Sequence, residues 1–371
     1  MLVTAIAGET SGDMLAANVL YNLQTYCEVD INGIGGSWLK QIGQQQWFDC
    51  HDLAVRGYVE ALPALRRIFH IRSHILKQLE KNKPSLYLGI DAADFNLHIE
   101  QYAHKLDIPV VHFISPSIWA WRKERIHKIK KAVNHMLCLF PFEPQIYHKA
   151  GVQASYVGHP LASKIAFEPD TLKAREELGI NADLTTIALL PGSRNSEIKY
   201  LGNIFLETAQ LLDKYVNRRI KFIIPIANQN IKPAIVKLVN QFKYLDITLT
   251  DSSSLALRSC DVALVASGTA TLETALHKKP MLIAYQVPWL TAQIMKRQGY
   301  LPYVGLPNIL AGRFIVPEYL QQRANPKSLF KGLVKLLESE NKEMIEEFHN
   351  MHRILHMDTI GLSAEIIASY I

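Results

Sequence analysis

Cysteine is scarce in this chain of 371 residues, and the four that occur, Cys27, Cys50, Cys138 and Cys260, stand far apart. None of them forms a C-x-x-C pair, which argues against a zinc site and against a disulfide framework. Isolated cysteines of this kind suit a reducing compartment. We therefore expect a cytoplasmic location.

Long apolar runs are also lacking, since no stretch approaches the roughly 20 residues that a transmembrane helix needs. The first apolar run, Leu2–Ala7, leads directly into Gly8-Glu9 and has no basic stretch before it. We expect this run to be a buried strand and not a signal peptide. Any contact with a membrane should therefore be peripheral.

The sequence contains no D-x-D triplet and no set of His and Cys residues at the spacing of metal ligands. We expect neither a metal nor another cofactor. The net charge of +6 suits an anionic partner, namely a nucleic acid, a phosphorylated substrate or an acidic membrane, although ordinary basicity is the alternative. No nucleic-acid-binding motif occurs, so we expect no nucleic-acid partner.

Hydrophobic residues make up 49% of the chain, enough for substantial cores. Short apolar runs alternate with helical patterns, which indicates an α/β fold with doubly wound parallel sheets. The runs that we predict as strands are Leu2–Ala7, Leu86–Ile90, Val110–Ile114, Met136–Leu139, Thr186–Leu190, Phe222–Pro225, Ile247–Leu249, Val262–Ala266 and Met281–Ala284.

The length suggests two domains. The pattern changes after Gly158-His159-Pro160-Leu161, where a polar helix precedes a new strand–loop–helix unit. We place an N-terminal domain at 1–165 and a second domain at 166–340. The charged segment 341–371 contains no strand pattern, so we expect a helical segment that packs on a domain or on a partner subunit.

Two motifs follow predicted strands in the first half. In Ala7–Asp13, glycines flank Glu9 and Ser11 at a helix start, where free N–H groups can bind an anion or a sugar hydroxyl. In Gly89–Asn96, Asp91 lies closest to the strand end and is the candidate general base. Simple helix capping is the alternative for both motifs.

An aromatic segment, Ser115–Arg122, follows the third predicted strand and precedes a basic helix. Its two tryptophans, Trp119 and Trp121, can stack on sugar rings or can fill the core. The pattern does not decide between these alternatives.

Three motifs occur in the second half, at Leu189–Arg194, Ala266–Glu273 and Leu306–Arg313. Arg194 can make a bidentate contact with a phosphate, and the small residues after the strand at 262–266 expose helix N–H groups to a pyrophosphate. A surface salt bridge and a close helix–sheet contact are the alternatives. The residues that we expect to bind a phosphorylated donor are Ser193, Arg194, Ser267, Gly268, Thr269, Glu273 and Asn308.

The segment from Tyr58 to Leu79 combines an apolar stripe with basic residues at helical spacing. A second basic stretch runs from Arg122 to Lys131. This mixture is typical of a helix that lies in a membrane interface, although a stripe facing the core is the alternative. The residues that we expect to face an anionic membrane are Val59, Leu62, Leu65, Ile68 and Phe69.

Together these motifs closely resemble those of the lipid-A-disaccharide synthase family, in order and over nearly the whole chain. Two departures occur, since Ala93 stands where we expect proline, and Gly36-Ser37-Trp38-Leu39 differs from the usual Gly-Pro-x-Met. The resemblance implies a GT-B fold, in which two Rossmann-like domains face one cleft. It also implies a homodimer with exchanged C-terminal segments, at the inner face of the inner membrane of a Gram-negative cell.

The same resemblance implies an inverting, metal-free transfer of 2,3-diacylglucosamine from UDP-2,3-diacylglucosamine to 2,3-diacylglucosamine 1-phosphate. The products would be UDP and a β-1,6-linked tetraacyl disaccharide 1-phosphate. In this scheme Asp91 is the catalytic base, and Glu9 and Ser11 orient substrate groups. Two rivals are a UDP-sugar epimerase of the same fold and a non-enzymatic binder of anionic lipid or nucleic acid.

Overall fold

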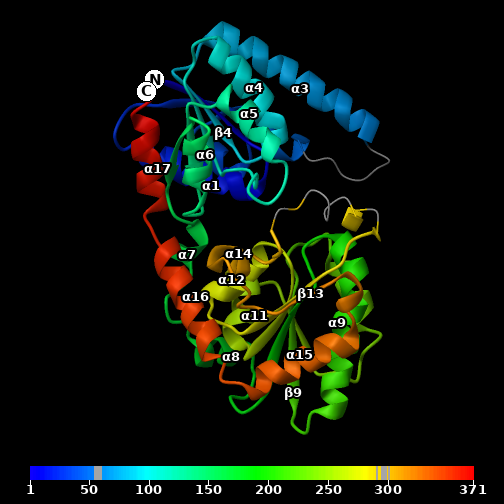
Figure 1. The fold of residues 1–371 in the computed structure, drawn as a ribbon. Coiled ribbons are helices and arrows are strands. Elements are labelled where there is room, and N and C mark those ends of the chain that lie inside the picture. The colour runs from blue at the N-terminus through cyan, green and yellow to red at the C-terminus, as the bar shows by residue number, and fades with distance from the viewer. Residues whose placement is uncertain (54–60, 290, 294–298, 300) are drawn as a thin grey trace. The chain divides into compact units, whose positions relative to one another are not determined.

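The computed structural model describes residues 1–53, 61–289, 291–293, 299 and 301–371, with the side chains of 61–64 left out. The chain divides into two compact units (Figure 1). The first unit comprises Met1–Pro160 together with Leu355–Ile371, and the second comprises Leu161–Ile354.

The first unit is built on a parallel sheet in the order β3-β2-β1-β4-β5-β6-β7. Its strands are β1 (Leu2–Ala7), β2 (Asp30–Gly35), β3 (Gln45–Asp49), β4 (Leu86–Ile90), β5 (Val110–Phe113), β6 (His135–Cys138) and β7 (Gln153–Tyr156). The two central strands, β1 and β4, are buried almost throughout, as strands covered on both faces must be.

Helices connect these strands, as parallel pairing requires. They are α1 (Thr10–Leu23), α2 (Ser37–Gln41), η1 (Cys50–Leu53), α3 (Ala61–Asn82), α4 (Ala93–Lys105), η2 (Lys123–Arg125), α5 (Ile126–Lys130), α6 (Glu143–Lys149) and, from the end of the chain, α17 (Thr359–Ala368). Figure 1 shows α3 as a long helix at one side of this unit, next to α4.

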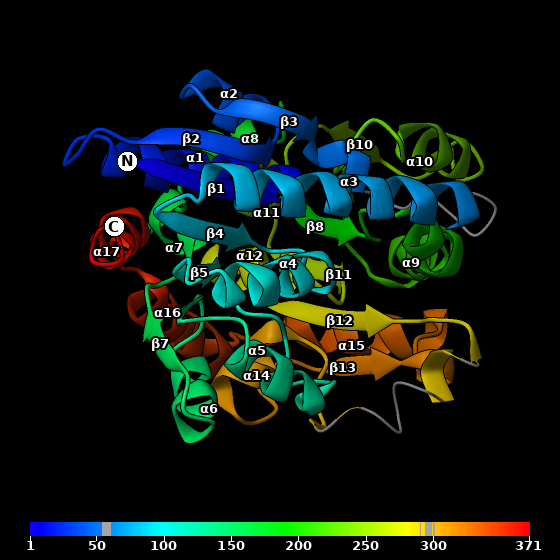
Figure 2. The ribbon, with the colours of Figure 1, turned by 90° about the horizontal axis from the view of Figure 1, so that it is seen from above.

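The second unit has a parallel sheet in the order β10-β9-β8-β11-β12-β13. The strands are β8 (Thr185–Leu190), β9 (Ile220–Pro225), β10 (Ile247–Thr250), β11 (Val262–Ala266), β12 (Met281–Tyr285) and β13 (Glu318–Leu320). The helices are α7 (Pro160–Lys164), α8 (Thr171–Glu177), α9 (Asn195–Tyr215), α10 (Lys232–Val239), α11 (Ser253–Ser259), α12 (Thr269–Leu276), α14 (Leu306–Ala311), η3 (Gln321–Arg323), α15 (Pro326–Glu338) and α16 (Lys342–Leu355). Figure 2 shows β12 and β13 side by side at one edge of the sheet.

The last two helices belong to different units. Helix α16 lies in the second unit, whereas α17 packs on α1 in the first (Figure 1). Ala364 and Ile367 of α17 join the apolar core beneath α1. The structure thus divides after Pro160, whereas the sequence analysis placed the domain boundary after residue 165. The predicted C-terminal segment 341–371 is divided between the two units.

None of the helices among the described residues combines the length and the hydropathy that crossing a bilayer requires.

Candidate functional site

Asp91 stands directly after β4, in a tight turn that leads into α4. Asp91 and Ala92 both have left-handed backbone angles, with φ of 49° and 37°. Two successive non-glycine residues in this region are uncommon, and such geometry persists only where the surroundings enforce it. The backbone N–H of Asp91 donates to the carbonyl of Phe113 at 2.9 Å, which ties the turn to β5.

The glycines of the first motif make room for the Asp91 side chain. Its Oδ1 atom accepts a hydrogen bond from the Gly8 N–H at 2.8 Å. A Cβ atom on Gly12 would lie 2.0 Å from Oδ2, and one on Gly8 would lie 2.7 Å from Oδ1. Gly8 and Gly12 are therefore required because Asp91 packs against them.

Asp91 has an unusual protonation equilibrium for a carboxyl group. Its pKa is raised to about 7, chiefly by burial and also by the nearby charge of Glu9, although the Gly8 hydrogen bond and the charge of His112 act to lower it. Its Oδ2 atom is buried and has no hydrogen-bond partner among the described residues. Because Oδ2 has no accessible surface in this conformation, the Asp91 side chain must turn away from Gly12 before Oδ2 can accept a proton from a bound hydroxyl.

Glu9 and Ser11 lie at the start of α1, beside Asp91 in the fold. Both residues are exposed, and Glu9 is the N-cap residue of α1 without a side-chain capping bond. Because neither side chain is required to cap the helix, both are available to a ligand. Their roles as substrate-orienting residues stay a prediction.

Asp94 was the other carboxylate of the second motif, and its surroundings differ. It is exposed and pairs with Arg125 and, at 3.5 Å, with Arg122. These contacts attach the start of α4 to the basic segment. Asp94 therefore has a structural partner, which leaves Asp91 as the candidate base.

The two tryptophans of the aromatic segment have different surroundings. The indole N–H of Trp119 donates to Glu143 Oε1 at 2.9 Å, and its ring packs edge-on against Phe140 and Phe142. Trp121 is exposed, and the guanidinium of Arg122 lies 4.3 Å from its ring centroid. Trp119 is thus part of the packed structure, and only Trp121 presents an aromatic face to solvent.

Two further polar residues hold this region together. The amide of Asn96 donates to the carbonyls of Ile6, Ile90 and Asp91, so it fixes the ends of β1 and β4. Asp13 is fully buried and accepts hydrogen bonds from three backbone N–H groups at the start of α2, those of Gly36, Trp38 and Leu39. The segment that departs from the family pattern therefore keeps its connection to α1 through the backbone.

In the second unit, a glutamate occupies the start of α9. Glu197 Oε2 accepts hydrogen bonds from the N–H groups of Ser193 at 2.8 Å and Arg194 at 3.2 Å, and Oε1 lies 3.2 Å from Arg194 Nη1. The carboxylate thus sits where we predicted a phosphate. Ser193 and Arg194 are exposed, with the Arg194 side chain 77% accessible.

The start of α12 is more open. Its N-cap residue, Gly268, has φ of 152°, no side-chain capping bond, and only open space where a Cβ would be. Thr269 is exposed, whereas the Ser267 hydroxyl donates to the Val304 carbonyl at 2.8 Å. Glu273 Oε1 accepts from Ser253 at 2.7 Å, and burial raises the Glu273 pKa.

Asn308 is 0% exposed, and its amide is fully used within the chain. Its nitrogen donates to Val316 O and Glu318 Oε1, and its oxygen accepts from the N–H groups of Ile315 and Val316, each at 2.8 Å. The prediction that Asn308 contacts a donor directly is therefore at odds with its surroundings. Burial and four internal hydrogen bonds leave no polar atom of its amide for a ligand.

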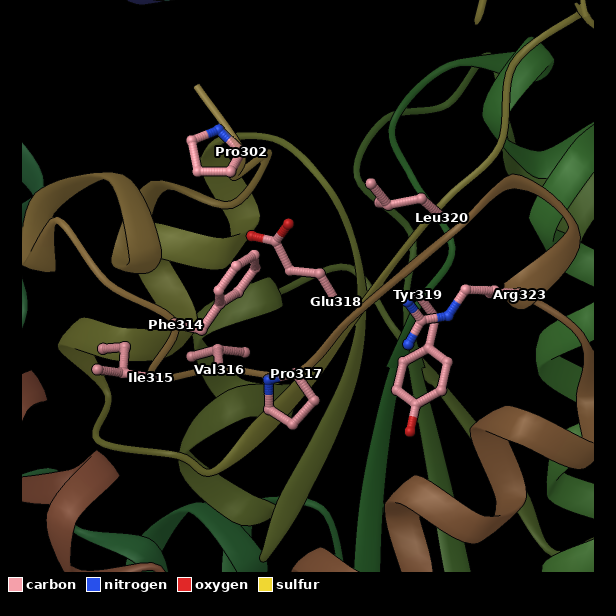
Figure 3. Close-up of a pocket in the computed structure, with 9 residues that line it drawn as sticks. All are labelled: Pro302, Phe314, Ile315, Val316, Pro317, Glu318, Tyr319, Leu320 and Arg323. Carbon is pink, nitrogen blue, oxygen red and sulfur yellow. The ribbon is translucent and has the colours of Figure 1, made fainter. Parts of the chain in front are cut away.

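Glu318 was missed by the sequence reasoning because it lies outside the motifs. Its carboxylate accepts from the N–H groups of Val304 and Gly305 at 3.0 and 2.9 Å, in addition to Asn308. A pocket of about 550 Å³ lies beside it in the second unit (Figure 3). Its lining residues are Pro302, Phe314, Ile315, Val316, Pro317, Glu318, Tyr319, Leu320 and Arg323.

One group of potential metal ligands occurs in the described part of the chain, at Asp49, Cys50 and His51. His51 Nδ1 lies 2.8 Å from Asp49 Oδ1 and 3.5 Å from Cys50 Sγ. Burial and neighbouring carboxylates raise the Cys50 pKa to about 12, so the thiol is protonated at neutral pH. These groups satisfy one another, and we assign no metal to them.

Helix α3 divides the predicted membrane stripe. Ile71, Ile75 and Leu79 are buried in the core, whereas Leu65 and Phe69 are 48% and 60% exposed. Ile68 is half-buried against the core cluster, so it is unsuited to the membrane role predicted for it. Val59 lies outside the described residues, as does the side chain of Leu62.

Comparison with solved structures supports the fold. MurG from Acinetobacter baumannii superposes with a TM-score of 0.61 at 13% identity, covering 99% of each chain. A UDP-GlcNAc 2-epimerase from Neisseria meningitidis, bound to UDP-GlcNAc, gives 0.61 at 15% identity, covering 100% of this chain and 99% of the other. Two parallel-sheet α/β units with these neighbours constitute a GT-B fold.

Sequence comparison gives the family. The sequence model of the lipid-A-disaccharide synthetase family matches residues 3–368 of this chain. The lipid-A-disaccharide synthase of Paraburkholderia xenovorans is 48% identical over 374 residues, covering 100% of this chain and 96% of that relative. The lipid-A-disaccharide synthase of Burkholderia vietnamiensis is 48% identical over 367 residues, covering 98% of this chain and 94% of that relative. With a match that spans both units and all six motifs, the chain belongs to the lipid-A-disaccharide synthetase family of enzymes.

Proposed function

We propose that this enzyme transfers 2,3-diacylglucosamine from UDP-2,3-diacylglucosamine to 2,3-diacylglucosamine 1-phosphate. The products are UDP and a β-1,6-linked tetraacyl disaccharide 1-phosphate. One observation carries the proposal beyond family membership, namely the buried Asp91 carboxylate, held through Oδ1 and unpartnered at Oδ2. Sugar transfer to a hydroxyl needs such a base, because the attacking oxygen must lose its proton.

The proposed reaction is a single displacement with inversion. Asp91 Oδ2 accepts the proton of the acceptor 6-hydroxyl, whose oxygen forms a bond to C1 of the donor sugar. The bond between C1 and the UDP oxygen breaks, and UDP leaves with its electron pair. Glu9 and Ser11, exposed beside Asp91, orient substrate groups in this scheme.

Two helix starts in the second unit carry the predicted donor motifs, those of α9 and α12. Of these two, the start of α12 suits the diphosphate better. Its N-terminus is uncapped and faces open space at Gly268, and helix N–H groups favour anions. At the start of α9, the Glu197 carboxylate already accepts hydrogen bonds from the backbone N–H groups of Ser193 and Arg194. We propose that Arg194 releases Glu197 and turns its exposed guanidinium to the diphosphate.

The remaining donor residues take different roles in this proposal. Glu273 accepts a hydrogen bond from a ribose hydroxyl, and Ser267 and Thr269 line the diphosphate. Asn308, being buried, supports the loop at 304–305 through Glu318 and does not touch the donor. Arg194 and helix N–H groups stabilise the negative charge on the leaving UDP, so the reaction requires no metal.

We propose that the enzyme docks on the inner face of the inner membrane, where its acylated substrates lie. Leu65 and Phe69 are one helical turn apart and exposed, and Arg66 and Arg67 beside them are exposed too. A basic helix with exposed apolar residues can lie in an anionic interface. The substrate chains then stay in the bilayer while the sugar reaches Asp91.

We also propose a homodimer with exchanged C-terminal segments. In the single chain, α17 packs on α1 through residues of the core. The same contacts can form with α1 of a second copy, which makes exchange a low-cost route to a dimer. A purely monomeric mass at micromolar concentration in analytical ultracentrifugation would contradict this proposal.

The reaction is tested by incubating the purified protein with both lipid substrates and analysing the lipids by mass spectrometry. We expect the tetraacyl disaccharide 1-phosphate together with one UDP per molecule of product, and the same yield in EDTA. An epimerised donor, or UDP released equally without acceptor, would support the epimerase alternative instead. Loss of activity in EDTA that Mg²⁺ or Mn²⁺ restores would overturn the metal-free mechanism.

A further inference from the structure

A compact charged cluster at the start of α4 has no part in the proposed reaction. The carboxylate of Asp94 faces two guanidinium groups, that of Arg125 and, at 3.5 Å, that of Arg122. Within these three groups, one negative charge stands against two positive charges. The Asp94 side chain is 77% exposed and that of Arg122 is 40% exposed, so a solute can reach both. An ion pair as open as this contributes little to stability, so stability alone does not explain it.

The protein holds the two arginines in fixed positions. Arg122 has a left-handed backbone angle, with φ of 55°, which is uncommon for a residue other than glycine. Its guanidinium lies 4.3 Å from the centroid of the Trp121 ring, and that of Arg125 lies 5.5 Å from the same centroid. Trp119, two residues earlier, is anchored to Glu143 through its indole N–H. Because the guanidinium groups are already ordered, they lose little freedom when they bind an anion.

The cluster lies beside the proposed base. Asp94 is in the first turn of α4, which begins two residues after Asp91, and one helical turn rises by about 5.4 Å. The segment 114–122 follows β5, whose last residue, Phe113, accepts the N–H of Asp91. Since β4 and β5 are parallel neighbours, both segments leave the same edge of the sheet, where ligands of such sheets bind. One sugar bound at Asp91 can therefore present a second group to the arginines.

The charge and shape of the arginine pair suit a phosphate monoester. Each guanidinium is a planar fork whose parallel N–H donors match the oxygens of a phosphate group. Because the Asp94 carboxylate is exposed, a phosphate can join it between the two forks or take its place. Lys128 and Lys130 on α5, both exposed, add to the positive potential that attracts such a group.

We propose that Arg122 and Arg125 bind the phosphate monoester of the acceptor, while Asp91 takes the proton from the hydroxyl at the other end of the same sugar. This inference rests on the proposed transfer reaction, to which it adds the contact that recognises the acceptor. The UDP-sugar donor has a diphosphate esterified at both ends and no phosphate monoester. The arginine pair therefore distinguishes the acceptor from the donor.

The first test compares two acceptors in detergent solution, diacylglucosamine 1-phosphate with short acyl chains and the same sugar without its phosphate. The wild type should prefer the phosphorylated acceptor in kcat/KM by about 10–10²-fold or more, the scale of hydrogen bonds between charged groups. Arg122→Gln and Arg125→Gln should each reduce this preference by about 10-fold or more and leave activity on the other acceptor unchanged. Arg258→Gln, at an arginine 3.7 Å from Glu177 in the second unit, is the matched control and should keep the preference. Equal losses on both acceptors, or an unchanged preference, would overturn the proposal.

Further variants separate phosphate binding from a structural role of the ion pairs. Asp94→Asn breaks the pairs but keeps both arginines, so the preference should be kept or increased. A loss as large as that in the arginine variants would show that the arginines only attach α4. Arg122→Lys and Arg125→Lys keep the charge next to Asp94 and serve if the glutamine variants do not fold. They should keep only part of the preference because lysine lacks the planar fork, and full preference in both would contradict the proposal.

The closing measurement needs no turnover. Calorimetry with diacylglucosamine 1-phosphate alone should show binding to the wild type that is about 10-fold weaker or more in Arg122→Gln and Arg125→Gln. Such binding without disaccharide formation would refute the transferase proposal and leave the phosphate site in place. Disaccharide formation with unchanged acceptor affinity in the variants would refute the phosphate site alone. If the variants also lose flotation with anionic vesicles while acceptor affinity is unchanged, the pair binds lipid headgroups and the proposal is wrong.

Discussion

At the scale of single residues, the candidate site is organised by what Asp91 requires. Two glycines of α1 and its preceding loop make space for its carboxylate, Asn96 holds its carbonyl, and Phe113 holds its N–H. The sequence placed these glycines at a helix start whose free N–H groups can bind an anion or a sugar hydroxyl. Their actual partner, an aspartate 83 positions after Gly8, was not visible in a local pattern because the contact depends on the β1–β4 pairing.

This packing predicts the effect of Gly12→Ala. The added methyl group would lie 2.0 Å from Asp91 Oδ2, so the carboxylate must shift and its hydrogen bond with the Gly8 N–H is disturbed. Since a misplaced catalytic group can cost about 10²-fold, we expect kcat to fall by that order. In an Asp91→Ala background the same change should cost little further activity. A full additional loss there would indicate that Gly12 acts independently of Asp91.

The Asp91 pKa of about 7 predicts the pH dependence of the wild type. A general base acts in its ionised form, so kcat/KM should fall tenfold per pH unit as the pH drops below about 7. An ordinary carboxyl group would place this limb near pH 4. Initial rates between pH 5 and 9, with UDP release as the readout, distinguish the two. Full activity at pH 5 would contradict an ionised Asp91 base with this pKa.

Arg194 is exposed and bonded only at the surface to Glu197, so its removal should not unfold the protein. We expect Arg194→Ala to weaken UDP binding by about 1.5–3 kcal/mol, the scale of a hydrogen bond to a charged group. Lysine should restore binding only in part, because it lacks the planar fork of the guanidinium. Calorimetry with UDP measures both variants. Unchanged affinity in Arg194→Ala would remove this residue from the donor site.

At the scale of elements, periodicity and composition predicted the central strands well. All nine predicted strands occur, with ends displaced by two residues at most. The strands β2, β3, β7 and β13 were missed. β2 contains two glycines, β3 begins with two polar residues, and β7 and β13 are short edge strands, so none has the continuous apolar run of a central strand.

The same scale explains what motifs at strand ends did and did not predict. The sequence correctly located helix starts after β1, β8 and β11, because glycine and small residues mark them. It did not distinguish a helix start whose N–H groups are free from one whose N–H groups already bond to a side chain. That difference depends on Glu197 at α9, whereas α12 has no acidic residue in its first turn.

The structure of helix α3 narrows the membrane prediction to two exposed apolar residues, Leu65 and Phe69. Leu65→Ser with Phe69→Ser should reduce flotation with anionic vesicles while leaving the fold intact, since both side chains are exposed. Binding of the wild type should also fall with added salt. Leu172→Ser on α8, at a leucine 70% exposed, is the matched control and should bind like the wild type. Unchanged flotation of the double variant would place docking elsewhere.

At the scale of the whole molecule, the chain forms two parallel α/β units, and its last helix returns to the first of them. The strand pattern was sufficient for this fold class. The return of α17 was not predictable from its sequence, since its apolar residues suit packing on either unit or on a second copy. The proposed base lies in the first unit, and the loops proposed to bind the donor lie in the second.

The central claim is that Asp91 in the first unit is the base for transfer to a lipid acceptor. The most direct measurement is UDP release by the wild type and by Asp91→Asn, each with and without 2,3-diacylglucosamine 1-phosphate. We predict release by the wild type only with acceptor, a kcat about 10²–10⁴-fold lower in the variant, and nearly equal affinity of both proteins for UDP. A folded Asp91→Asn protein with near-normal kcat would contradict the account.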